Sequence, residues 1–264
     1  MEQPAFFKRF LKKSGNFAFS SLSILLFILV WEIAGRTGLI NAKFLPPFST
    51  VVVSLWELAK SGVLLAHIKI SLERALVGYI LGVAFAVPLG IAIGTFRRLE
   101  QFLNPLLQLF RNMSVLALLP VFVLFFGIGE VSKVGVIFWG VLWNVLLNTV
   151  SGVKNVDQVI IKGARAIGTS RIRLFATVIL PGALPHIFSG MRISATTSIV
   201  ILIAAEMLGA SKGLGYALYF YQANMMIPRM YSVIIIMAVL GVVLNFILEA
   251  IERHNFRWRD NIDV

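Results

Sequence analysis

The sequence has no cysteine, half as many acidic as basic residues, and none of the short motifs of common catalytic sites. Without cysteine, neither a disulfide framework nor a thiolate metal site is possible. No G-x-x-x-x-G-K-[ST] run occurs, so the chain cannot cradle ATP in such a loop. The serine-elbow and H-E-x-x-H motifs are missing too, and His67, His186 and His254 do not pair at ligand spacing. These absences argue against an enzyme and against a metal site.

Long apolar runs dominate the 264 residues, of which 58% are hydrophobic and only 14% charged. A soluble domain is far more charged, and several runs reach the roughly 20 residues that cross a bilayer. We therefore predict an all-α, polytopic membrane protein with about six transmembrane helices. The expected spans are 17–35, 75–95, 103–126, 134–150, 186–207 and 231–250.

Basic residues indicate the orientation of these spans. One set of loops holds 14 of the 24 Lys and Arg residues, and the other set, which includes Arg74, holds 8. Because basic loops stay in the cytoplasm, both termini and the 151–185 segment are expected there. The same rule accounts for the net charge of +12, so nucleic-acid binding is not expected. We predict a basic N-terminal segment 1–16, one membrane domain 17–250 in contact with lipid, and a C-terminal tail 251–264.

Two segments on the outer side have residue patterns that plain loops do not show. Apolar stripes in 37–74 predict helices at the outer interface, one of them over 64–72. Residues 208–230 contain several glycines and tyrosines, which indicates an interfacial or re-entrant piece. In the second span, small residues recur every four positions and form a face for close helix packing. They are Gly78, Gly82, Ala86, Gly90 and Gly94.

The 151–185 segment interrupts the apolar pattern with a polar, basic stretch. Apolar residues at helical spacing predict a short helix with one apolar stripe, which can bury itself in a cytoplasmic partner. The stripe is Val156, Val159, Ile160, Ala164 and Ile167. Asn155 and Gln158 fit a capping box at its start, and Gly168 fits its end. A second short helix should follow and end at Leu180-Pro181.

Polar residues inside apolar spans are candidates for a pathway, because burying a charge there costs roughly 2.5–3.5 kcal/mol. Asn144 and Asn148 are four apart and share a helix face. These two and Arg111 either line a polar path or have a structural role only, in which Arg111 caps or pairs inside a broken helix, and the pattern leaves both interpretations open. The possible pathway residues are Arg111, Asn112, Asn144, Asn148 and Glu206.

The same segment resembles the cytoplasmic loop of bacterial ABC-importer permeases. That family's signature is Glu-Ala-Ala, three residues, Gly, nine residues, Ile, one residue, Leu-Pro. Here Lys162-Gly163-Ala164, Gly168, and Val178 with Leu180-Pro181 occupy those positions at the same spacing. Lys162 replaces the usual Glu, and Gly163 replaces the usual Ala. Further fragments, such as Phe44-Leu45-Pro46-Pro47 and Gly213-Leu214-Gly215-Tyr216, resemble the nitrate, taurine, sulfonate and bicarbonate branch.

The resemblance implies a type I ABC importer permease fold in a bacterial inner membrane. Two copies, or one copy and a close paralogue, would form the pathway above two ATPase subunits that hold ATP and Mg. A binding protein outside the membrane would deliver a small solute, either an anion of this branch or a thiamine-precursor-like or aromatic acid. The implied coupling residues are Lys162, Gly163, Ala164, Ile167, Gly168, Leu180 and Pro181. A channel or carrier that works without an ATPase, a membrane enzyme and a scaffold subunit are the alternatives.

Overall fold

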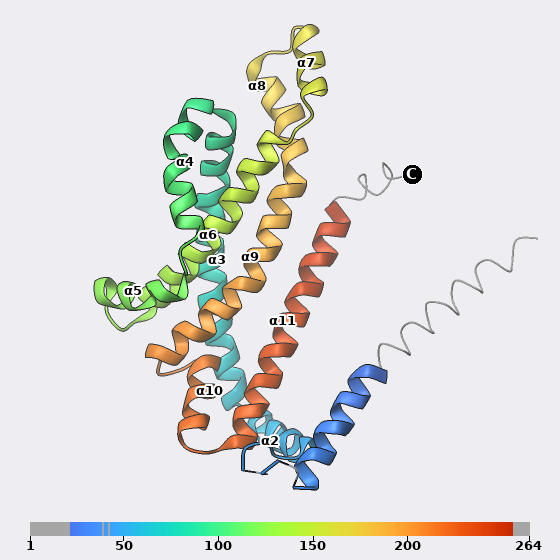
Figure 1. The fold of residues 1–264 in the computed structure, drawn as a ribbon, viewed down its shortest axis with the longest axis vertical. Coiled ribbons are helices and arrows are strands. Elements are labelled where there is room, and N and C mark those ends of the chain that lie inside the picture. Colours follow the sequence, from blue (N-terminus) through green and yellow to red (C-terminus); the bar gives the residue numbers. More distant parts are fainter. Residues whose placement is uncertain (1–21, 39, 42, 256–264) are drawn as a thin grey trace, which may run out of the picture. The chain divides into compact units, whose positions relative to one another are not determined.

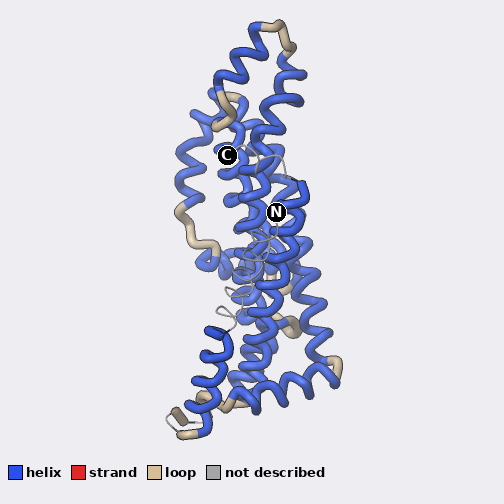
Figure 2. The backbone as a smooth tube through the Cα atoms, turned by 90° about the vertical axis from the view of Figure 1, so that its right-hand side faces the viewer, coloured by secondary structure: helices blue, strands red, loops and turns tan. Residues whose placement is uncertain are grey.

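The computed structural model describes residues 22–38, 40–41 and 43–255, and all regular structure in them is helical (Figures 1 and 2). This confirms the predicted all-α class. A helix over 22–36 comes first, and short 3₁₀ and π-helical turns lie at Leu116–Leu118 and Phe175–Ile179. The remaining helices are α2 (Phe48–Lys60), α3 (Val63–Thr95), α4 (Arg97–Arg111), α5 (Leu119–Phe126), α6 (Glu130–Lys154), α7 (Gln158–Ala166), α8 (Arg171–Leu174), α9 (Leu180–Gly209), α10 (Leu214–Ala223) and α11 (Ile227–Asn255).

Four helical stretches in the described residues are long and apolar enough to cross a membrane. They are Val63–Thr95, Glu130–Lys154, Arg171–Gly209 and Ile227–Glu252, and α4 with α5 adds a bent fifth candidate. The expected first span, 17–35, begins outside the described residues. From residue 22 onward the structure describes it, and this part is a helix. Length and composition therefore agree with a polytopic membrane protein.

The expected span over 103–126 is broken near its middle. The chain there forms two helices that are bent by 85°. Asn112 ends the first helix, and its side-chain amide donates to the carbonyl of Gln108 at 2.8 Å. Pro120 stands in the first turn of the second helix, where its missing N–H removes no helical hydrogen bond. A helix stop and a helix start thus lie within one apolar run.

The expected start of the second span at residue 75 is also wrong, because α3 begins at Val63. The stripe over 64–72 is the first part of this long helix and not a separate interfacial helix. Charged residues in that part, among them Arg74, lowered the apparent hydropathy. Arg74 is nevertheless only 6% exposed in the folded chain, because distant carboxylates pair with it.

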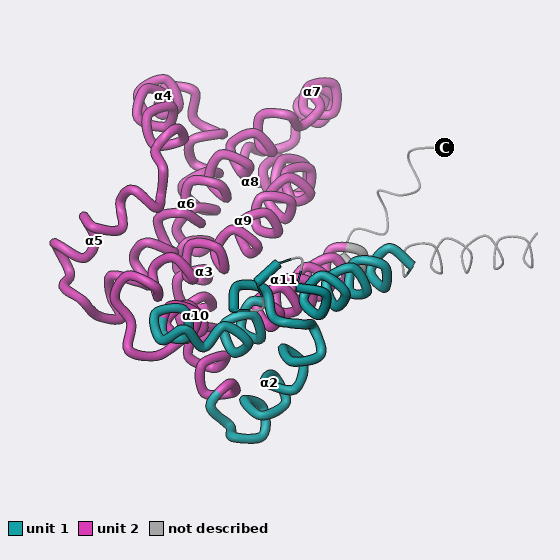
Figure 3. Tube along the Cα trace, turned by 60° about the horizontal axis from the view of Figure 1, so that its bottom comes forward, with its two compact units in different colours: residues 1–63, 220–234 teal, residues 64–219, 235–264 magenta. Residues whose placement is uncertain are grey.

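The described chain forms two compact units, residues 1–63 with 220–234 and residues 64–219 with 235–264 (Figure 3). In the second unit, α3, α6 and α9 run side by side (Figure 1), and their contacts make the main apolar core. The predicted small-residue face of α3 lies against α6. A Cβ atom at Gly82 would stand 2.7 Å from Cγ1 of Val141, and one at Gly90 would stand 2.7 Å from Cβ of Thr149. Only glycine allows the two backbones to approach this closely.

The first unit is organised around the indole of Trp31. Its N–H donates to the carbonyl of Pro46 at 3.0 Å, and its ring meets Phe48 and Tyr231 edge-on. Glu32 accepts hydrogen bonds from the backbone N–H and the hydroxyl of Ser49, both at 2.9 Å. Ser49 lies in the first turn of α2, so the carboxylate caps that helix where the helix dipole favours negative charge.

Candidate functional site

Polar side chains of α4 and α6 line an open groove of about 520 Å³. They recur every three or four residues on each helix, so each helix presents one polar face to the groove. Leu107, Leu147 and Val150 complete the wall. The polar lining residues are Glu100, Asn104, Gln108 and Arg111 on α4 and Asn144, Asn148, Ser151 and Lys154 on α6.

The charges along this groove are unequally satisfied. Lys154 donates to Glu100 at 2.6 Å, so these two charges neutralise each other between the helices. The guanidinium of Arg111 forms no hydrogen bond or ion pair with any residue that the structure describes. The neighbouring Phe110 holds this end of α4 in place, because its ring stacks on Trp143 at 4.6 Å and meets Trp139 edge-on at 5.2 Å.

The structure brings together three of the five residues that the sequence suggested for a pathway, namely Arg111, Asn144 and Asn148. Asn148 also donates its side-chain amide to the carbonyl of Asn144 at 2.8 Å. Asn112 does not line the groove and instead ends α4. Glu206 lies near the C-terminal end of α9, only 1% exposed, in a different cluster of charged groups.

The centre of that second cluster is Arg74, which the distribution of basic residues places in the outer loops. Its guanidinium donates to both carboxylate oxygens of Glu130, at 2.5 and 2.6 Å, and to Glu206 at 2.7 Å. A third acceptor is the carbonyl of Lys212, at 2.7 Å. The Nζ of Lys133 lies 3.9 Å from Glu130, so two cations face two carboxylates. The two carboxylate partners of Arg74 are 56 and 132 residues away from it along the chain, so no local pattern could reveal the cluster.

The Arg74 cluster also fixes the turn between α9 and α10. Glu206 accepts from the hydroxyl of Ser71 at 2.8 Å and from the N–H of Gly215 at 2.8 Å. Ser71 in turn accepts from the N–H of Leu214 at 2.8 Å. A side chain at Gly213 would collide with the Glu206 carboxylate, so this turn requires a glycine. The buried charges of this cluster thus each have several hydrogen-bond partners, which offset the cost of removing a charge from water.

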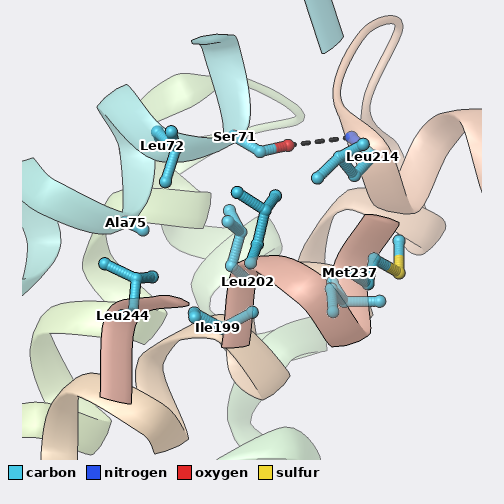
Figure 4. A pocket seen from close by; sticks show the side chains of 10 residues that line it. Ser71, Leu72, Ala75, Ile199, Leu202, Leu214, Met237 and Leu244 are labelled. Carbon is cyan, nitrogen blue, oxygen red and sulfur yellow. Dashed lines mark hydrogen bonds between the residues drawn. The ribbon is translucent and has the colours of Figure 1, made fainter. Parts of the chain in front are cut away.

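An apolar cavity lies beside Ser71, among α3, α9, α10 and α11 (Figure 4). Its volume is about 20 Å³, and apart from Ser71 its lining is aliphatic or methionine. The Ser71 hydroxyl points to the backbone N–H of Leu214 and so is already engaged (Figure 4). A space of this size holds about one water molecule, so it is too small for a transported solute.

The short helix α7 lies beyond the ends of α6 and α9, together with α8 (Figure 1). Asp157 caps its start by accepting from the N–H of Val159 at 2.7 Å, so the predicted Asn155 cap is wrong; Asn155 ends α6 instead. The predicted stop at Gly168 is confirmed. Gly168 has a φ of +77°, and Thr169 N–H donates to the carbonyl of Ala164 at 3.2 Å, as in a glycine-terminated helix.

The apolar residues of this segment divide between two faces. Val156 and Ile161 pack on Leu174 inside the chain, with Ala164 beside them. The predicted stripe is therefore wrong for Val156 and Ala164, which face inward. Four large apolar side chains point away from the chain, with exposed fractions of 56–84%. This exposed apolar face consists of Val159, Ile160, Ile167 and Ile172.

The second short helix of this segment does not end at Leu180-Pro181, contrary to the prediction. Helix runs on from Arg171 to Gly209 through the π-helical turn Phe175–Ile179. A proline inside an α-helix removes a hydrogen bond and clashes with the carbonyl four residues earlier. The wider π turn just before Pro181 shifts those carbonyls, so the helix passes the proline.

Comparison with known proteins identifies the family. Residues 86–257 match the model of the binding-protein-dependent transport system inner membrane component. The chain belongs to this family. It is 36% identical over 240 residues to the aliphatic sulfonates transport permease SsuC of Bacillus subtilis, covering 89% of this chain and 86% of that one. It is 32% identical over 257 residues to the taurine transport permease TauC of Escherichia coli, covering 96% and 93%.

The fold of this permease agrees with its family. A solved chain of the MetNI methionine ABC transporter, in an inward-facing conformation, has a TM-score of 0.62 and covers 78% of this chain and 96% of its own length. At 19% identity, this likeness concerns the fold alone. The predicted importer permease, a non-catalytic membrane component of an ABC transporter, is thus confirmed.

Proposed function

We propose that this permease forms the solute pathway of its importer, that α4 and α6 line that pathway, and that α7 receives the motion of a cytoplasmic ATPase. The observation that carries the proposal is the exposed apolar face of α7, its C-cap residue Ile167 and Ile172 of α8, because large apolar side chains outside a bilayer serve a partner surface. The internal packing of Val156, Ile161 and Leu174 holds α7 on the bundle. A force on α7 is therefore passed to α6, which precedes it in the chain, and through α8 and the π-helical turn to α9.

The permease works as part of a larger complex in this proposal. ATP and Mg bind to two ATPase subunits, two permease copies or a copy and a paralogue surround the pathway, and a binding protein delivers the solute. The 151–185 segment and both termini are on the cytoplasmic side, which matches the basic-residue bias. The division into 1–16, 17–250 and 251–264 stays a prediction, and much of its two terminal segments lies outside the described residues.

The cargo that we propose is a small anion such as a sulfonate, taurine, nitrate or bicarbonate. Two relatives are described as permeases for aliphatic sulfonates and taurine, and the net charge of this chain is +12. A thiamine-precursor-like or aromatic-acid solute is the second candidate.

Substitution of the exposed face of α7 tests the coupling role. Ile167 is 83% exposed, so Ile167→Glu should leave the fold intact. An isoleucine buried in a partner contributes about 1.5–3 kcal/mol, so its loss should weaken ATPase binding at least 10-fold. The measurement is co-purification of tagged permease with its ATPase, together with ATP-driven uptake.

The matched control for this test is Gln158→Glu. Gln158 is exposed in the first turn of α7, the helix that Ile167 caps, on the face of Lys162 and Arg165 and away from the apolar face. A negative charge there suits the helix dipole. Full ATPase binding by the Ile167→Glu protein, with normal uptake, would rule out α7 as the coupling element.

A further inference from the structure

We propose that Arg111 makes the groove between α4 and α6 a binding site for a single oxyanion group, and that it selects the cargo by charge. This inference rests on the proposed pathway function, because it names the chemical class that the pathway accepts. It assigns the selection to one residue of the permease itself and not only to the delivering protein.

The charges of the groove carry the first step. The lining contains three charged residues, Glu100, Arg111 and Lys154. Glu100 and Lys154 neutralise each other at 2.6 Å, so one positive charge remains, and it belongs to Arg111. Among the residues that the structure describes, nothing pairs with this guanidinium. A solute that enters the groove therefore meets one uncompensated cation.

The position of Arg111 in the chain carries the second step. It closes α4 in the bent pair that is the fifth candidate span, and within a span a charged residue is costly and marks an ion or substrate path. Another arginine in a candidate span, Arg74, is fully paired, because it donates hydrogen bonds to two carboxylates and a backbone carbonyl. The chain thus surrounds one arginine with acceptors and leaves the other open to the groove.

The neutral lining residues carry the third step. Asn104, Gln108 and Asn144 bring side-chain amides to the groove, and no described residue bonds to these amides. Amide N–H groups donate to oxygen atoms, and a guanidinium binds two oxygens of one group in parallel. A sulfonate, carboxylate or nitrate group offers such oxygens. The groove volume of about 520 Å³ leaves room for a small organic tail.

Packing keeps the site in place. Phe110 stacks on Trp143, so the residue next to Arg111 is held against α6, the helix that carries Asn144 and Asn148. The cationic group and the amides therefore come from two helices that aromatic packing holds together. A binding site requires this kind of support for its side chains.

The absence of cysteine allows a direct test in the complete transporter in liposomes. Asn144→Cys places one thiol on the permease wall of the groove. Two methanethiosulfonate reagents of similar size serve as probes, one with a sulfonatoethyl group and one with a trimethylammonioethyl group. Mass spectrometry of the permease chain gives the rate of labelling by each reagent. We expect the anionic reagent to be favoured, and free butanesulfonate to slow both reactions.

Removal of the charge should then abolish the preference for the anionic reagent. In the Arg111→Gln background, the ratio of anionic to cationic labelling rates should fall about 10-fold, because a nearby charge changes the two rates by a few-fold in opposite directions. Arg111→Lys should keep the ratio within about 3-fold of the original. Arg98→Gln is the matched control: Arg98 is exposed on the same helix and does not line the groove, so the ratio should not change.

Two different failures are distinguishable. If both reagents label the thiol but the ratio is the same with Arg111 and with Gln, the groove carries water and the assigned role of Arg111 is wrong. If neither reagent labels it in resting or ATP-driven transporters, the groove is not an aqueous path, and the proposed pathway is overturned together with this inference.

Discussion

At the scale of single residues, the Arg74 cluster combines buried and exposed charges. The Arg74 cluster is almost closed: Arg74 is 6% and Glu206 1% exposed, and hydrogen bonds engage both. Glu130 differs, since 64% of its side chain is exposed. The removal of one partner from a buried ion pair leaves the other charge buried and unpaired. This costs more free energy than the intact pair contributes to stability.

We therefore expect Arg74→Met to destabilise the permease by about 3–5 kcal/mol, because the Glu206 carboxylate stays buried without its paired guanidinium. The double variant Arg74→Met with Glu206→Gln should recover part of this loss. Thermal unfolding in detergent, followed by tryptophan fluorescence, measures both. A single variant that melts with the parent protein would show that the cluster does not stabilise this fold.

At the scale of helices, the glycine row of α3 decides how closely α3 and α6 pack. Gly78, Gly82, Gly90 and Gly94 each leave a space that a side chain of α6 occupies. The four-residue repeat was visible in the sequence because it depends on local spacing alone. The breaks in the fold were less visible, since Asn112 and the π turn before Pro181 act through backbone hydrogen bonds that hydropathy does not report.

Gly82→Leu should separate the two helices and lower stability by about 1–3 kcal/mol or prevent assembly, because the added side chain meets Val141. Val141→Ala should restore part of the stability by making room. Gly241→Leu is the control on α11, since a Cβ there meets nothing within 4 Å. Equal behaviour of the two leucine variants in the same unfolding assay would contradict the packing argument.

At the scale of the whole molecule, family and fold class were predictable, but much of the candidate site was not. The resemblance of the 151–185 segment to a family signature indicated an importer permease, and Arg111 and Asn144 were found because polar residues are rare in apolar spans. The inward turn of Val156 and Ala164 was not predictable, because it depends on Leu174, which follows in a separate helix. The acceptors of Arg74 come from α6, α9 and the turn after α9, and only folding brings them together.

Transport by the complete assembly should depend on ATP. Liposomes that contain only this permease should take up no butanesulfonate or nitrate, and addition of the ATPase, the binding protein and ATP should start uptake. The comparison uses the same liposomes with a nucleotide that cannot be hydrolysed. Sustained flux through the permease alone would favour the alternative of a channel or carrier.

The interlocked glycine row has a mechanical consequence. Because α3 and α6 fit together along most of their length, they can move only as one rigid body during a transport cycle. The compliant part then has to be the corner between α4 and α5, where the chain turns by 85°. Because Phe110 holds the end of α4 against Trp143 of α6, a hinge at this corner would swing α5 and leave the guanidinium of Arg111 beside the asparagines of α6.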